Sequence, residues 1–142
     1  MKTFQKLLLF TTMLVLLSAI PSMAQMDNGV TFETQFAFYA GNAKMPAGSY
    51  KVTQPDANSD LLLIESPNGA YSVFVDFVPV QSETPASNTD VTFNKYGKTD
   101  FLNGISLQGQ NFGIQIVASK AEQNAAKAAA AEKHTLSAKN GR

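Results

Sequence analysis

Apolar and polar side chains alternate with a period of two over much of this chain, and no other feature constrains its fold as strongly. At residues 32–38, Phe32, Phe36 and Phe38 share one face with Thr34, while a glutamate and a glutamine lie between them on the other face. A period of two is typical of a β-strand with one face in the core. The pattern therefore predicts a half-buried strand in this segment.

Six further segments rich in aromatic and β-branched residues follow before residue 118. They lie at residues 50–52, 61–64, 71–80, 91–96, 101–107 and 112–117. Such residues fit a pleated, half-buried surface. The connections are short, and none holds the helix that a parallel crossover needs. We therefore predict an all-β domain of about seven antiparallel strands, arranged as a sandwich or a small barrel.

Turn-forming residues separate the predicted strands. Asn68 and Gly69 are the strongest hairpin signal, because both residue types tolerate the positive φ of tight turns. Residues 45–48, Met-Pro-Ala-Gly, predict a second turn. The polar residues 81–89 predict a long loop, and residues 103–104, Asn-Gly, interrupt an apolar run as either a bulge or a turn.

The pattern changes after residue 117. Ser119 and Glu122 have the spacing of a capping box, in which each side chain accepts a hydrogen bond from a backbone amide at the helix start. An alanine-rich run follows, which predicts a C-terminal helix at residues 118–134 and a polar, flexible tail at residues 135–142. Because the apolar face of the helix is almost entirely alanine, two alternatives stay open: the helix docks on the β domain, or it projects toward a partner.

The N-terminus has the composition of a secretion signal. Lys2 and Lys6 flank the start of an apolar run at residues 7–20, and the small side chains of Ser22 and Ala24 fit a signal-peptidase site. The run has 14 residues, whereas a membrane-spanning helix needs about 20. We therefore predict cleavage after Ala24 and a periplasmic or secreted protein with no transmembrane segment.

Composition and charge then limit the classes of protein. We predict a signal peptide at residues 1–24 and one β domain at residues 25–117. The chain has no cysteine, so no disulfide framework can replace a hydrophobic core. Residues 25–117 carry four lysines against nine carboxylates, whereas residues 118–142 carry five basic residues against two carboxylates. An acidic domain without a basic stripe argues against nucleic-acid binding.

Few residues are candidates for catalysis. The single histidine, His134, falls in the polar region beyond the capped helix, where a base is not held against a nucleophile. Four carboxylates, Glu65, Asp76, Asp90 and Asp100, are candidates for glycan hydrolysis, which needs no histidine. We assign no catalytic residue.

Asp76 has the most informative surroundings of the four. It shares a strand face with Phe74 and Val78. It is therefore either buried, with its pKa raised, or solvated on an outer face that is half apolar. We favour the solvated alternative.

One segment has donors that suit a metal ion. Residues 56–60, Asp-Ala-Asn-Ser-Asp, match the opening of a calcium loop. Leu61 then takes the place of the turn glycine and Pro67 that of the bidentate glutamate, so we interpret the segment as a polar hairpin loop. A zinc site has less support still, and no glycine-rich segment leads into a phosphate-binding loop. We assign no metal or cofactor site.

Three motifs resemble those of a family of uncharacterised bacterial exported proteins. They are Phe38-x-x-Gly41-x-x-x-Met45-Pro46-Ala47-Gly48-x-Tyr50, Phe93-x-x-Tyr96-Gly97-x-x-x-Phe101-Leu102 and Ser119-x-Ala121-Glu122. The match covers most of the chain after the signal, although the family usually has leucine at the position of Met45 and often proline at that of Val117. The resemblance implies an all-β domain, and it transfers no activity and no catalytic residue.

The chain has ten phenylalanines, which either fill the core or line an apolar cavity. We expect a filled core, because small barrels are usually packed by their own side chains. The expected function is that of an exported, non-catalytic binding or structural module with a protein or cell-envelope partner. The alternatives are a carrier of an apolar small molecule in an aromatic-lined barrel and, third, a carboxylate-dependent hydrolase.

Overall fold

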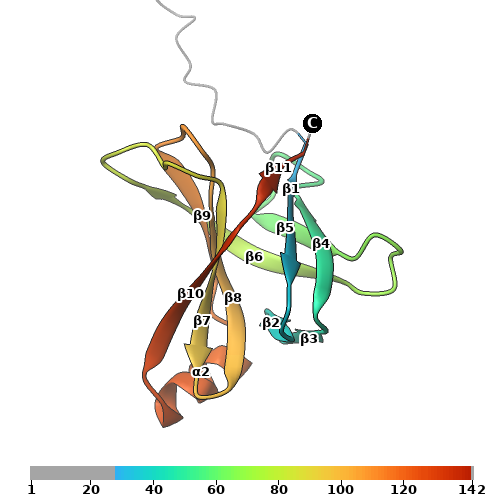
Figure 1. Cartoon of the computed structure of the whole chain (residues 1–142), viewed down its shortest axis with the longest axis vertical. Helices are drawn as coiled ribbons and strands as arrows, with labels where there is room; N and C mark the ends of the chain where they lie inside the picture. Colours follow the sequence, from blue (N-terminus) through green and yellow to red (C-terminus); the bar gives the residue numbers. More distant parts are fainter. Residues whose placement is uncertain (1–27, 142) are drawn as a thin grey trace, which may run out of the picture.

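Strands dominate the structure, a computed structural model that describes residues 28–141 (Figure 1). The predicted signal peptide at residues 1–24 lies outside the described residues. The one helix described is α2 (Lys120–Ala128). The strands are β1 (Val30–Thr34), β2 (Phe38–Ala40), β3 (Ala43–Met45), β4 (Gly48–Thr53), β5 (Leu61–Glu65), β6 (Ser72–Gln81), β7 (Asp90–Tyr96), β8 (Thr99–Ser106), β9 (Phe112–Ile116), β10 (Ala131–Ser137) and β11 (Lys139–Asn140).

The strands form two sheets that share β6. The first half of β6 pairs with β5, in the order β6-β5-β4-β1-β11, and its second half pairs with β9, in the order β6-β9-β8-β7-β10. These neighbours along both sheets are antiparallel, and the short β2 adds a parallel pair with β8. The predicted all-β class is confirmed, and the arrangement is sandwich-like. A single ten-residue strand therefore belongs to both layers.

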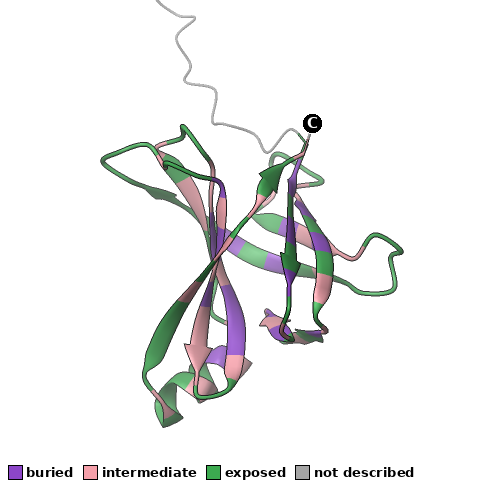
Figure 2. Ribbon diagram, viewed as in Figure 1, coloured by how far each residue is buried: buried purple, intermediate pink, exposed green. Residues whose placement is uncertain are grey.

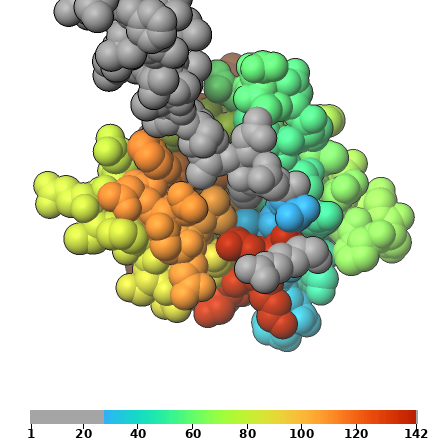
Figure 3. Space-filling view, turned by 90° about the horizontal axis from the view of Figure 1, so that it is seen from above, coloured from blue at the N-terminus to red at the C-terminus, as the bar shows by residue number. Residues whose placement is uncertain are grey.

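The C-terminal segment connects the two sheets a second time. Strand β10 pairs with β7 over its whole length, and after Ala138 the short β11 pairs with β1. Figure 1 shows this segment, in red, crossing between the sheets, and Figure 3 shows the C-terminal residues beside the start of β1, in blue. Both outer edges of the two sheets are thus paired by one continuous stretch of chain.

This arrangement corrects two sequence predictions. The helix begins as predicted after Ser119 but ends at Ala128, because Ala129 is already extended, so the range 118–134 was too long. The flexible tail predicted at residues 135–142 was wrong, since strands occupy most of residues 131–140. The physical reason is that residues 131–140, as strands, satisfy main-chain groups on the exposed edges of β7 and β1. A longer alanine-rich helix would leave these edges unpaired and would bury little apolar surface in return.

The inner faces of both sheets form one hydrophobic core, which is purple in Figure 2. Its centre is a group of aromatic rings in edge-to-face contact. The ring of Phe93 lies 5.3 Å from those of Phe36 and Phe38, and the ring of Phe38 lies 5.2 Å from that of Tyr50. Such offset contacts are the favoured geometry for aromatic pairs. The aromatic side chains therefore pack against one another at the centre of the molecule.

The strand predicted at residues 32–38 is broken in the middle. Strand β1 ends at Thr34 and β2 begins at Phe38, with a bend between them. The Thr34 hydroxyl donates a 2.7 Å hydrogen bond to the Phe36 carbonyl. This local bond gives the Phe36 carbonyl a hydrogen-bond donor at the point where the chain leaves the sheet.

The turns follow the sequence signals. Residues 66–71 form the predicted hairpin, with Gly69 at a φ of 69°. The choice left open at Asn103 and Gly104 is decided in favour of a bulge, because the register between β7 and β8 shifts there. A Cβ on Gly104 would lie 2.8 Å from the Ile114 carbonyl oxygen. Glycine is therefore required at this position by close strand packing.

Candidate functional site

The outer face of β6 carries apolar side chains that point away from the core. Val75 and Phe77 are buried, whereas the alternating positions Phe74, Asp76 and Val78 are exposed, as the bands along β6 in Figure 2 show. Phe74 is 58% exposed and Val78 is 46% exposed. A strand at the junction of two sheets thus presents three large apolar groups, Phe74, Val78 and Val80, to solvent.

Neighbouring strands extend this surface on both sides of Asp76. Leu61 of β5 lies opposite Asp76 in the register, and the Val117 amide, just after β9, donates a 2.9 Å hydrogen bond to the Asp76 carbonyl. Leu61 is 38% exposed and Val117 is 47% exposed. We call this surface the Asp76 face, and it consists of Leu61, Phe74, Asp76, Val78 and Val117.

The favoured sequence alternative for Asp76 is confirmed, because its side chain is exposed on a half-apolar outer face. The other carboxylates weighed for catalysis lie on different strands. Glu65 is on β5, in register with Lys51, and Asp90 begins β7. Within residues 28–141 no three acidic, histidine or cysteine side chains are grouped so that they could hold a metal ion.

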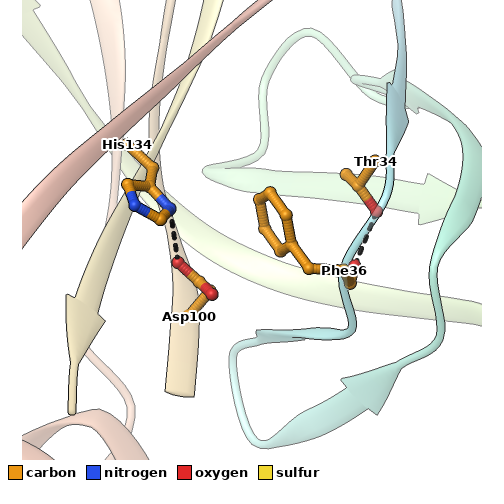
Figure 4. Close-up of polar contacts among 4 residues, drawn as sticks. All are labelled: Thr34, Phe36, Asp100 and His134. Carbon is orange, nitrogen blue, oxygen red and sulfur yellow. Dashed lines mark hydrogen bonds and ion pairs between the residues drawn. The ribbon is translucent and has the colours of Figure 1, made fainter. Parts of the chain in front are cut away.

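His134 occupies a different position from the one predicted. It is held on β10 opposite Phe93, and its Nδ1 lies 3.1 Å from Oδ1 of Asp100 on β8 (Figure 4). Asp100 is only 4% exposed, and its Oδ1 has no well-aligned hydrogen-bond donor, so the imidazole nitrogen is its close polar contact. The sequence placed this histidine in a polar tail, and that placement was wrong, because β10 holds it in the sheet.

The surroundings of His134 indicate what this pair does. Its ring lies 5.9 Å from that of Phe36, and no hydrogen bond among residues 28–141 joins it to a hydroxyl group that could serve as a nucleophile. The nearby Thr34 hydroxyl is bonded to the Phe36 carbonyl (Figure 4). The contact therefore attaches β10 to the buried side of β8.

A second polar cluster holds helix α2 against the outer face of β7. The carboxylate of Glu122, which is buried, accepts hydrogen bonds from Asn94 Nδ2 at 2.9 Å and from the Tyr96 hydroxyl at 3.3 Å. Burial raises the pKa of Tyr96, and the charge of Glu122 raises it further. The helix thus docks on the β domain, which answers the question that its sequence left open.

The same cluster corrects half of the predicted capping box. The Ser119 hydroxyl accepts a 3.2 Å hydrogen bond from the Glu122 amide, as predicted. The Glu122 side chain instead turns toward the sheet and accepts from Asn94 and Tyr96. Sequence spacing indicated the cap, but no local signal showed that strand residues more than 20 positions away would compete for this carboxylate.

The segment that resembles a calcium loop bonds to its own backbone. Asp56 Oδ1 accepts a 2.9 Å hydrogen bond from the Asn58 amide, and the Ser59 hydroxyl donates to the Asp56 carbonyl at 3.0 Å. These are the local bonds of an Asx-type turn. The interpretation of residues 56–60 as a polar loop is confirmed.

No helix within residues 28–141 has the length and apolarity needed to cross a membrane.

Comparison of the chain with protein-family models, with curated protein sequences and with solved structures finds no match.

Proposed function

We propose that this chain is an exported, non-catalytic binding module that contacts a partner through the Asp76 face. The observation that carries the proposal is the exposure of four apolar side chains on one face, namely Leu61 on β5, Phe74 and Val78 on β6, and Val117 just after β9. Contiguous apolar side chains on the surface of a folded domain mark interaction sites far more often than scattered ones do. The N-terminal signal pattern and the resemblance to exported proteins support the export part of the proposal.

The strands that carry the Asp76 face hold it in a fixed conformation, which favours binding. Val75 and Phe77 anchor β6 in the core on its inner side, and hydrogen bonds to β5 and β9 hold its two halves. A surface built on paired strands is fixed before a partner arrives, so little conformational entropy is lost on binding. The arrangement is therefore suited to recognition.

Two observations favour this role over that of an apolar carrier. The central aromatic rings contact one another at 5.2 to 6.1 Å, which is typical of packed aromatic clusters. A depression of about 500 Å³ between the ends of the sheets is lined by polar side chains, which include Asn88, Gln108 and Asn140. Apolar cargo requires the opposite lining.

Site-specific photocrosslinking in producing cells tests the proposal. A photoreactive phenylalanine analogue at position 74 should give a discrete adduct of higher mass. The matched control is the same analogue at Phe112, which is 44% exposed but lies on β9 in register with Gln81, away from the Asp76 face. Equal adduct patterns at the two positions, or none at either, would contradict the proposal.

A further inference from the structure

We infer that the Asp76 face recognises an arginine or lysine side chain presented by a partner protein, with apolar groups on both sides of that cation. This inference rests on the proposed function and adds the chemistry of the partner. It comes from the position of one carboxylate within an apolar surface.

Asp76 is surrounded by apolar side chains on the outer face. Phe74 and Val78 lie two residues before and after it on the same strand face, Leu61 lies opposite it on β5, and Val117 lies beside it on the other edge. The single ion pair within residues 28–141 joins His134 to Asp100. In this part of the chain, Asp76 therefore has no cationic partner of its own.

The free energy of covering the Asp76 face depends on whether the partner is apolar or cationic. A neutral apolar partner would remove water from the Asp76 carboxylate without replacing its hydrogen bonds, which is costly. A guanidinium or ammonium group would replace them, and a surrounding ring of apolar contacts would exclude water from the pair. The aliphatic stems of arginine and lysine also suit the apolar neighbours. Arginine fits best, because it can bind a carboxylate through two parallel hydrogen bonds.

The charge of the domain favours the same kind of partner. Residues 28–117 carry four lysines against eight carboxylates. A negative surface accelerates encounter with cationic proteins and disfavours the anionic surface of a membrane. A second copy of this chain could offer the exposed Lys120 or Lys127 of α2. We assign the face to a different protein, because the exposed side of that helix places Gln123 and Asn124 beside these lysines and carries no large apolar side chain.

Nuclear magnetic resonance titration of the isotope-labelled secreted protein tests the inference. The probes are two short, extended peptides that differ at one position, one with Val-Arg-Val at its centre and one with Val-Gln-Val. The arginine peptide should shift the amide signals of the Asp76 face and should bind about tenfold more tightly than the glutamine peptide, as expected for one charge-assisted pair. Asp76→Asn should abolish this preference. Glu33→Gln, which removes an exposed carboxylate from β1, should retain it.

Phe74→Ser and its control Phe112→Ser separate this inference from the proposed function. If the two peptides bind equally, or Asp76→Asn changes nothing, while Phe74→Ser alone weakens binding, the inference is overturned and the binding face stands. If Phe74→Ser behaves like Phe112→Ser, or no peptide binds at millimolar concentration, both are overturned. Analytical ultracentrifugation adds the last arm, because self-association lost in Asp76→Asn would overturn the assignment to a different protein.

Discussion

At the scale of single residues, two carboxylates are buried while several large apolar side chains are exposed. Asp100 and Glu122 are buried carboxylates, whereas Phe74 and Val78 are exposed apolar residues. Charged side chains are rarely buried unless they are paired. Here each buried carboxylate contacts a side chain from a distant part of the chain, namely His134 for Asp100 and Asn94 for Glu122. The buried charges therefore fix how the C-terminal segment lies on the sheet.

Loss of the His134 contact should lower stability. We expect His134→Ala to reduce the free energy of unfolding by about 1 to 3 kcal/mol, because Asp100 is then left buried without a polar partner. Urea denaturation measures the change, with Thr135→Ala on the exposed side of β10 as the control. In a double-mutant cycle with Asp100→Asn, the two effects should be less than additive. Full additivity would show that the contact does not stabilise the fold.

Tyr96 should make the protein sensitive to alkaline pH. Its pKa is raised in the folded state above the model value of 10.0, first by burial and then by Glu122. The folded state therefore holds this proton more tightly, so the contribution to stability is present below pH 10.0 and is lost as the pH rises through the raised pKa.

The variant Tyr96→Phe tests this dependence. At neutral pH its free energy of unfolding should fall by about 0.5 to 1.5 kcal/mol, because the hydrogen bond to Glu122 is removed. Above pH 10, however, its stability should decline less steeply than that of the wild type. Denaturation midpoints measured from neutral to strongly alkaline pH give the comparison, with the exposed Tyr71→Phe as the control. An unchanged alkaline slope in Tyr96→Phe would contradict the expectation.

At the scale of elements, the sequence predicted the features that depend on local chemistry. The alternation in β1 and β6, the Asn68-Gly69 hairpin and the solvated Asp76 all follow from periodicity or turn preference. Strand β10 was missed because its sequence, Ala-Glu-Lys-His-Thr-Leu-Ser, has no clear local strand signal, and its stability comes from pairing with β7. The His134–Asp100 contact was missed for the same reason, since it exists only once β10 is in place.

The C-terminal strands should be essential for folding. Removal of residues 131–142 leaves β7 and β1 with unpaired edges and deletes His134, so we expect the truncated chain to lose cooperative thermal unfolding and to aggregate. Circular dichroism and light scattering during heating measure both effects. Deletion of residues 141–142 alone is the control and should leave the transition close to that of the full chain. A truncated chain with an unchanged transition would show that β10 contributes little.

At the scale of the whole molecule, the domain joins two sheets through β6 and again through the C-terminal segment. Most of the carboxylates lie within residues 28–117. In contrast, Lys120 and Lys127 belong to α2, and Lys133 and Lys139 belong to the two strands that close the sheet edges. A basic segment lying on an acidic body gains favourable long-range electrostatic energy. The division of charge seen in the sequence thus corresponds to two parts of one folded unit.

Export should remove the N-terminal signal. We expect the protein recovered from the cell envelope or the medium to begin at Gln25, because Ala24 and Ser22 offer the small side chains that the peptidase requires. Intact-mass spectrometry measures the N-terminus directly. The variant Ala24→Tyr should accumulate as the uncleaved precursor, and Gln25→Asn should be processed normally. Recovery of full-length wild-type chain from the cytoplasm alone would contradict the prediction.

The pairing of β11 with β1 places the two ends of the domain in one ladder. Because β10 and β11 are the last strands in the sequence, neither sheet can acquire its outer edge until almost the entire chain is available. Contacts between residues so distant in sequence form slowly, and they form late in a chain that emerges from its N-terminus. A chain of this design therefore stays incompletely folded until its last dozen residues are free to pair with β7 and β1.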